Sequence, residues 1–193
     1  MSTEQIKIAI VGNSGVGKTS IINWYIKNVQ ETSPTVGANI QDIVIDIDGK
    51  KTNLNIWDTA GQLQYRDIMP LYFRDVNLII ICFSAVDQES FDDIKSWNDL
   101  IVDHAPTEVV KLIVCNKIDL EKDPMPQDKI DNMKYEISAT DVFRTSALTG
   151  EGIDLIFEFI KYDKSIPRDK NFLSIDENVN ISSNPENNSQ SCC

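Results

Sequence analysis

The sequence lacks the features that mark several classes of protein. It contains no run of about 18 apolar residues, the length that a helix needs to cross a bilayer. Residues 1–5 do not have the pattern of a secretory signal peptide, and residue 2 is serine, whereas N-myristoylation requires glycine there. We therefore expect a protein of the cytosol.

Positive charge is also scarce. The 193 residues include 18 Lys and Arg against 30 Asp and Glu, which gives a net charge of −12. Surfaces that bind nucleic acids neutralise phosphates with clustered Lys and Arg, so this charge argues against a nucleic-acid partner. The single histidine, His104, ends a predicted helix, where its cation is favoured without any catalytic role. A chain of this length usually folds as one domain with a substantial core.

Cysteine is sparse, and its four copies are of two kinds. Cys82 and Cys115 lie in apolar, strand-like runs, as expected for buried thiols in a reducing compartment. Cys192 and Cys193 end a polar stretch, where burial is not expected. The plain interpretation of this pair is two unmodified thiols.

The first motif that is present is Gly-x4-Gly-Lys-Thr at residues 12–19, between an alternating apolar run and a helix-like segment. Such a loop turns backbone N–H groups toward a phosphate, while Lys18 adds a cation and the Thr19 hydroxyl can ligate Mg²⁺ at the helix N-terminus. The motif predicts binding of a nucleoside triphosphate. The candidate phosphate-binding residues are Ser14, Gly15, Val16, Gly17, Lys18, Thr19 and Ser20.

A second motif, Asn116-Lys117-Ile118-Asp119, follows an apolar, β-rich run directly, so it is expected at the carboxyl end of a strand. Guanine presents two adjacent donors, its ring N1–H and its amino group, and the Asp119 carboxylate can accept both. Adenine has an acceptor at that ring nitrogen and cannot pair in the same way. The nucleotide is therefore predicted to be GTP or GDP.

A third motif closes another strand pattern with Asp58-Thr59-Ala60-Gly61-Gln62. Asp58 can hold Mg²⁺ through a water, the Gly61 N–H can bond the terminal phosphate, and Gln62 can orient the attacking water. This combination of groups is suited to phosphoryl transfer.

These three motifs, followed by Ser146-Ala147-Leu148, resemble in type and order those of small GTPases of the Ras superfamily. Within it the chain most resembles the Rab family, on residues 36–40 after Thr35, residues 56–61, residues 71–76 and the terminal pair of cysteines. The resemblance implies a P-loop G domain that binds GTP or GDP with Mg²⁺ and hydrolyses GTP slowly. It also implies a switch in vesicle traffic on the cytoplasmic face of an intracellular membrane.

The resemblance further implies roles for single residues. Thr35 would contact Mg²⁺ and the γ-phosphate and would act in catalysis with Gln62 and Lys18. Ala147 would offer its N–H to the guanine oxygen beside Ser146 and Leu148, and the Lys117 stem would cover the base. Cys192 and Cys193 would carry geranylgeranyl groups. The implied partners are an exchange factor, a GAP, a GDP-dissociation inhibitor, the prenylation machinery and effectors, with the protein itself a monomer.

The hydrophobic pattern predicts a doubly wound α/β fold. A β-hairpin is expected around Asp48-Gly49, and four further strands are expected near residues 7–11, 78–83, 110–115 and 141–145. Helices are expected near residues 20–27, 88–103 and 152–162. The prediction is a six-stranded, mostly parallel sheet with one antiparallel strand pair and helices on both faces.

The sequence divides into a G domain at residues 1–165 and a tail at residues 166–193. The tail is rich in Asn and Ser and should not fold alone, so we expect a tether with a mean span on the order of 30 Å.

Two alternatives stay open. The segment between Lys18 and Thr35 is slightly short for the family, which would weaken nucleotide retention and suit a non-hydrolysing scaffold. A Ras- or Rho-like signalling GTPase is the other alternative, although the C-terminal Cys-aliphatic-aliphatic-X box that it would carry is absent.

Overall fold

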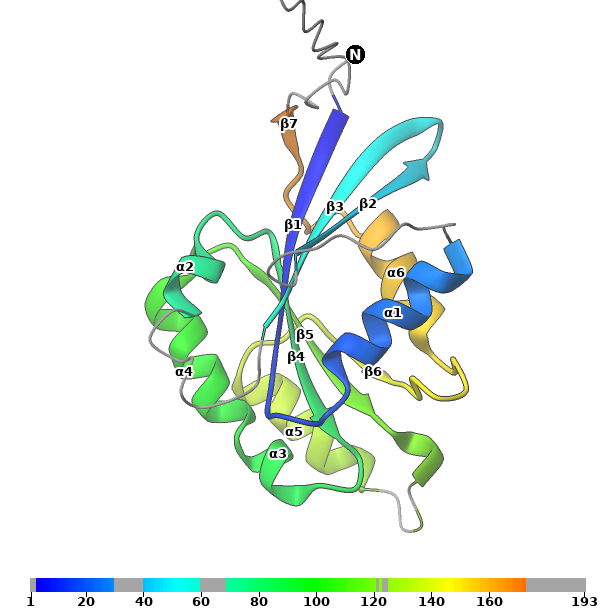
Figure 1. Ribbon diagram of the computed structural model, residues 1–193. Coiled ribbons are helices and arrows are strands. Elements are labelled where there is room, and N and C mark those ends of the chain that lie inside the picture. Colours follow the sequence, from blue (N-terminus) through cyan, green and yellow to red (C-terminus); the bar gives the residue numbers. More distant parts are fainter. Residues whose placement is uncertain (1–2, 30–39, 60–68, 121, 123–124, 173–193) are drawn as a thin grey trace, which may run out of the picture.

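The computed structural model describes residues 3–29, 40–59, 69–120, 122 and 125–172. They form an α/β fold around one sheet, in which the strand order is β2-β3-β1-β4-β5-β6 and β7 pairs with β1 (Figure 1). The strands are β1 (Thr3–Val11), β2 (Ile40–Ile47), β3 (Lys50–Asp58), β4 (Leu78–Ser84), β5 (Val110–Asn116), β6 (Asp141–Arg144) and β7 (Asp169–Phe172).

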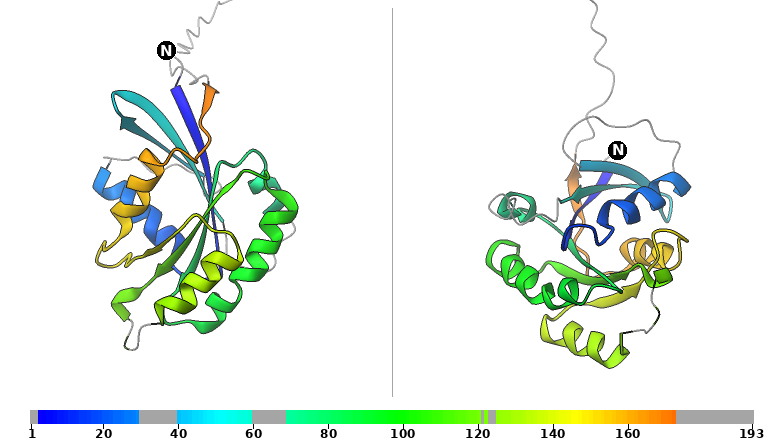
Figure 2. Two further views of the ribbon diagram at one scale, coloured as in Figure 1. Left: turned by 180° about the vertical axis from the view of Figure 1, so that it is seen from behind. Right: turned by 60° about the horizontal axis from the view of Figure 1, so that its bottom comes forward.

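Helices cover both faces of the sheet (Figures 1 and 2). Helices α1 and α6 pack on one face, and α2, α3, α4 and α5 pack on the other. Their bounds are α1 (Lys18–Val29), α2 (Met69–Phe73), α3 (Gln88–Asp92), α4 (Ile94–His104), α5 (Gln127–Glu136) and α6 (Ile153–Tyr162), with a 3₁₀ turn, η2, at Ile118–Leu120. None of the helices in the described part of the chain has the length and apolar character needed to span a bilayer.

Burial along the strands follows their place in the sheet. Every residue of β4, a central strand with parallel neighbours, is buried, as its continuous apolar run requires. Strand β2 is an edge strand, and it alternates between buried isoleucines (Ile43, Ile45, Ile47) and exposed residues. On the face of the sheet that α1 and α6 cover, the Tyr25 ring stacks on the Phe157 ring, with centroids 3.3 Å apart. The positions of the apolar residues along each strand thus determine which of its side chains face a helical layer.

The predicted six-stranded, mostly parallel sheet is confirmed as β1–β6, and β2 and β3 are its antiparallel pair. The structure adds β7, which pairs antiparallel with the first residues of β1. The predicted start of the tail at residue 166 is therefore too early, because Ile166 is only 3% exposed in the core and Asp169–Phe172 belongs to the sheet. The polar composition of this segment concealed its pairing, which depends on backbone hydrogen bonds to β1.

The helix predicted at residues 88–103 is divided at Asp93 into α3 and α4. Strands β1, β3, β4, β5 and β6 run parallel, so their carboxyl ends meet at one edge of the sheet. All the predicted nucleotide motifs follow these ends.

Candidate functional site

The glycine-rich loop between β1 and α1 lies at the carboxyl edge of the sheet (Figure 1). Gly12 and Gly17 have φ values of +134° and +102°, which residues with a Cβ rarely adopt. A Cβ on Gly12 would lie 2.0 Å from the carbonyl oxygen of Cys82, and one on Gly17 would lie 2.2 Å from Asn116 Nδ2. The loop therefore needs glycine at both positions, because its backbone passes directly against β4 and β5.

The loop surrounds a buried cation. The Lys18 side chain is 6% exposed, and its ammonium donates to the carbonyl oxygens of Gly12 and Asn13, each at 2.8 Å. Burial lowers the pKa of Lys18, while the nearby Cys82 and Asp58 act in the opposite direction. A cation with little access to water is electrostatically complementary to a bound phosphate.

Asp58 and Thr19 meet at the N-terminus of α1. The Thr19 hydroxyl donates to Asp58 Oδ2 at 2.5 Å, and Asp58 Oδ1 is buried with no hydrogen-bond partner among the described residues. Burial raises the pKa of the Asp58 carboxyl, and the Thr19 hydrogen bond and the charge of Lys18 oppose this shift. A carboxylate oxygen without a partner beside a hydroxyl is a donor set that fits Mg²⁺, which prefers hard oxygen ligands and keeps several waters. These residues fit the metal that the sequence predicts.

Asn116 joins the glycine-rich loop to the segment that follows β6. The Asn116 amide is 1% exposed, and its Nδ2 donates to the Val16 carbonyl oxygen at 2.9 Å. Its Oδ1 accepts hydrogen bonds from the Thr145 hydroxyl and from the Ala147 backbone N–H, both at 3.1 Å. One buried side chain therefore fixes the relative positions of the predicted phosphate loop and the predicted base loops.

The predicted base-recognition residues lie together beside Asn116. The Ser146 hydroxyl donates to Asp119 Oδ1 at 2.5 Å, which leaves the Asp119 carboxylate oriented but at the exposed end of the site. Lys117 adopts a φ of +66°, an uncommon conformation that turns the chain between β5 and the η2 turn. Leu148 is 79% exposed at the rim of the same region. The structure thus brings together all of the described members of the predicted base site.

Five predicted site residues lie outside the described part of the chain: Thr35, Gly61, Gln62, Cys192 and Cys193. Their roles stay predictions.

Two polar residues of the site were not predicted from the sequence. Thr145 is fully buried and supports Asn116, and only its place directly before Ser146 could have indicated this. Asn13 contacts α4 through its side chain, and nothing in the local sequence signals that contact.

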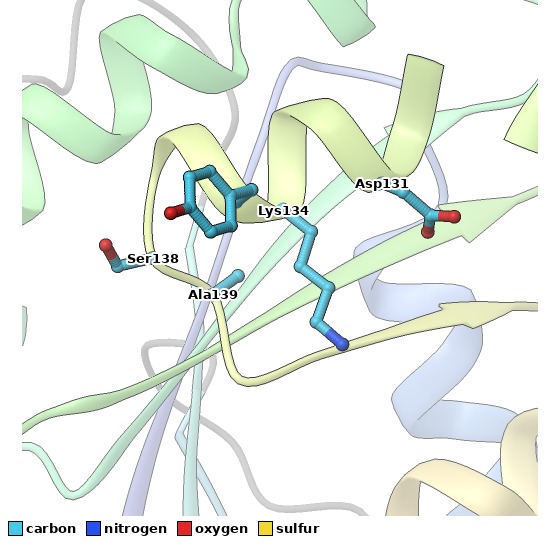
Figure 3. A pocket seen from close by; sticks show the side chains of 5 residues that line it. Asp131, Lys134, Ser138 and Ala139 are labelled. Carbon is cyan, nitrogen blue, oxygen red and sulfur yellow. The ribbon is translucent and has the colours of Figure 1, made fainter. Parts of the chain in front are cut away.

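A separate hollow of about 820 Å³ lies beside the C-terminal half of α5 (Figure 3). It is at the amino end of β6, whereas the nucleotide motifs follow the carboxyl ends. Its charged groups already have partners, since Asp131 accepts from Gln127 at 3.0 Å and Lys134 pairs with Asp141 at 3.1 Å. None of the predicted site residues that the structure describes lines this hollow.

The strand-to-helix loop, its buried lysine and its position at the carboxyl edge of a mostly parallel sheet define a P-loop nucleotide-binding domain. The family model described as "Ras family" matches residues 7–164. The chain therefore belongs to the Ras family, as a Rab-like small GTPase.

The relatives agree with the predicted resemblance. The chain is 34% identical to a probable Rab-related GTPase of Acanthamoeba polyphaga mimivirus, over all of this chain and 95% of that protein. It is 31% identical to the Ras-related protein RABE1e of Arabidopsis thaliana, over 97% of this chain and 92% of that protein. It is 32% identical to mouse Ras-related protein Rab-26 over 80% of this chain, and the match spans only 60% of that longer protein.

Proposed function

We propose that the protein is a molecular switch that binds GTP and GDP with Mg²⁺ and hydrolyses GTP to GDP and phosphate. The observation that carries the proposal is the joining of two loops by Asn116, one suited to phosphates and the other to guanine. A site that recognises both ends of one ligand at a fixed separation selects that ligand over free phosphate or free base.

In this proposal the backbone N–H groups of residues 14–20 and the Lys18 ammonium bind the phosphates. The Lys18 ammonium has three N–H donors, so it would keep its contacts with the Gly12 and Asn13 carbonyl oxygens and donate the third N–H to a phosphate oxygen. Asp119 would accept the two guanine donors, with its carboxylate oriented by Ser146. The Lys117 stem and Leu148 would cover the base, and the Ala147 N–H would face the guanine oxygen.

Thr19 and Asp58 would hold Mg²⁺, directly and through a water, together with Thr35. When bound, the metal supplies positive charge next to the β- and γ-phosphates. The Asp58 oxygen that has no hydrogen-bond partner among the described residues supports this assignment, because a buried carboxylate oxygen is costly unless a ligand satisfies it.

The hydrolysis step itself is assigned to Gln62, which would orient the attacking water, with Gly61 and Thr35 bonding the γ-phosphate. Lys18 and the loop amides would stabilise charge as the bond between the γ-phosphorus and the bridging oxygen breaks. The intrinsic rate of Ras, on the order of 10⁻⁴ s⁻¹, corresponds to a barrier of about 22 kcal/mol, and a GAP that accelerates it roughly 10⁵-fold lowers the barrier by about 7 kcal/mol. Timing in such a protein depends on its regulators.

The proposal extends to a role in membrane traffic, on the resemblance to Rab proteins. Thr35 and Gly61 would sense the γ-phosphate, so that effectors bind the GTP form only. An exchange factor, a GAP and a GDP-dissociation inhibitor would regulate the cycle. Geranylgeranyl groups on Cys192 and Cys193 would hold the protein at an intracellular membrane, and mass spectrometry of the native protein would detect them as two C20 additions.

The test is single-turnover hydrolysis of preloaded GTP in Mg²⁺ by the wild-type protein and by Gln62→Leu. We expect slow hydrolysis by the wild-type protein and at least a tenfold lower rate for the variant, because the attacking water loses its orientation. GDP affinity, measured in parallel, should stay within about threefold, since Gln62 is assigned no contact with GDP.

Equal hydrolysis by the two proteins would contradict the role of Gln62. Stable GTP binding without hydrolysis, even after long incubation, would favour the alternative of a non-hydrolysing scaffold.

A further inference from the structure

The Asn13 side chain links the glycine-rich loop to the helices on the opposite side of β1 from α1. Asn13 Nδ2 donates to Asp93 Oδ2 at 2.7 Å, and Asn13 Oδ1 accepts from Trp97 Nε1 at 2.9 Å. Asp93 joins α3 to α4, and Trp97 lies in the first turn of α4. Both contacts connect residues 80 or more positions apart.

The Asp93 carboxylate hydrogen-bonds to Asn13 instead of capping its own helix. Asp93 occupies the N-cap position of α4, where an aspartate normally accepts a hydrogen bond from the first turn, yet its side chain makes no capping hydrogen bond. Asp87, at the N-cap of the neighbouring helix α3, does cap its helix, because its side chain accepts from the Ser90 N–H at 3.2 Å. This difference indicates that the Asp93 carboxylate holds the glycine-rich loop rather than capping α4.

Trp97 supplies a rigid second support. Its side chain is 1% exposed, and its ring belongs to the apolar core between the sheet and helices α2–α5. A buried indole N–H requires an acceptor, and the amide oxygen of Asn13 provides one. Asn13 is thus held by two groups that the core and the helix junction keep in place.

The position of Asn13 bears directly on the phosphate site. The Asn13 carbonyl oxygen accepts from the Lys18 ammonium at 2.8 Å, so the same residue contacts α4 through its side chain and the phosphate-binding lysine through its backbone. Asn13 also precedes Ser14 and Gly15, the exposed residues at the top of the loop. Fixing the Asn13 side chain therefore fixes the peptide planes from which the loop directs its N–H groups.

We propose that Asn13, Asp93 and Trp97 form a clamp that holds the glycine-rich loop in its phosphate-binding shape and so controls nucleotide retention. Asn13 and Asp93 are positioning residues, and Asp93 acts on the phosphates without touching them. This inference rests on the proposed guanine-nucleotide site. It assigns part of the control of that site to the α3–α4 junction, outside the nucleotide motifs.

The test exchanges the amide of residue 13 and the carboxylate of residue 93. Asn13→Asp places a second carboxylate within hydrogen-bond distance of Asp93, and the repulsion should speed dissociation of a fluorescent GDP analogue by about 10- to 100-fold in Mg²⁺. The double variant Asn13→Asp/Asp93→Asn restores an amide–carboxylate pair with its direction reversed, and its dissociation rate should return to within about threefold of wild type. The matched control is Asp92→Asn, which removes one exposed carboxylate from the adjacent residue and should leave the rate unchanged.

Rescue by the double variant would show that the effect comes from the contact between residues 13 and 93. A general loss of stability would not be rescued, because only the double variant restores an amide–carboxylate pair. Thermal unfolding of each GDP-loaded variant identifies any that fails to fold. Asp93→Ala gives a second measurement without a new charge, and it should speed GDP dissociation about tenfold.

Three results would overturn the clamp: a wild-type dissociation rate for Asp93→Ala, a wild-type rate for folded Asn13→Asp, or a double variant no slower than Asn13→Asp. If the wild-type protein binds no guanine nucleotide, the proposed function and the clamp both fail. Wild-type binding with unaffected variants rejects the clamp alone.

Discussion

Gly17→Ala is expected to lower the affinity for guanine nucleotide by a thousandfold or more while leaving the domain folded. The new Cβ would lie 2.2 Å from Asn116 Nδ2, at a residue whose φ is +102°. Asn116 would have to move, which breaks its hydrogen bonds to Val16, Thr145 and Ala147. Backbone strain of roughly 1–3 kcal/mol and the loss of about 1 kcal/mol for each of the three hydrogen bonds together predict a loss of affinity of a thousandfold or more.

Isothermal titration with GDP in Mg²⁺ measures this loss. The matched control is Gly49→Ala, in the turn between β2 and β3, where φ is +79° and, among the described residues other than its chain neighbours, no atom lies within 4 Å of the new Cβ. That variant should lose stability through backbone strain but keep its GDP affinity. GDP binding by Gly17→Ala within tenfold of wild type would show that the contact between the glycine-rich loop and Asn116 is not needed.

Asp119→Asn is expected to change which base the protein prefers. The carboxylate accepts from two guanine donors, whereas an amide offers one acceptor and one donor, so a guanine donor faces a donor in the variant. We expect the affinity for GDP to fall by at least about a hundredfold, since charge-assisted hydrogen bonds of roughly 1.5–3 kcal/mol each are lost. Xanthine carries a carbonyl where guanine has its amino group, so the affinity for XDP should rise at the same time.

Competition between GDP and XDP for the variant and the wild-type protein checks this expectation. Asp128→Asn, in the first turn of α5, is the control for loss of one exposed carboxylate and should leave base preference unaltered. An Asp119→Asn protein with the wild-type preference for GDP would remove Asp119 from base recognition.

The contiguous motifs were predictable because their chemistry is local. The glycine spacing, the lysine and the hydroxyl within residues 12–19 determine how a strand-to-helix loop can bind a phosphate. The structure places that loop between β1 and α1. Apolar periodicity likewise located β1–β6, since a strand pattern depends mainly on neighbouring residues.

The remaining features depend on contacts distant in sequence. The hydrogen bond between Asn13 and Asp93 spans 80 residues, and the division of the predicted helix at Asp93 accompanies it. Strand β7 has little apolar character and is defined by its pairing with the first residues of β1, which were themselves left out of the predicted strand at residues 7–11. A local sequence pattern does not show that a polar side chain such as Asn13 contacts a residue far away in the sequence.

The loops at the carboxyl edge of the sheet are expected to form one site for a guanine nucleotide. Equilibrium binding of GDP, GTP and ATP to the wild-type protein, with Mg²⁺ and with EDTA, tests it most directly. We expect one GDP or GTP per chain, no displacement by a thousandfold excess of ATP, and faster release when EDTA removes the metal. Equal binding of ATP and GTP, or binding of neither, would contradict it.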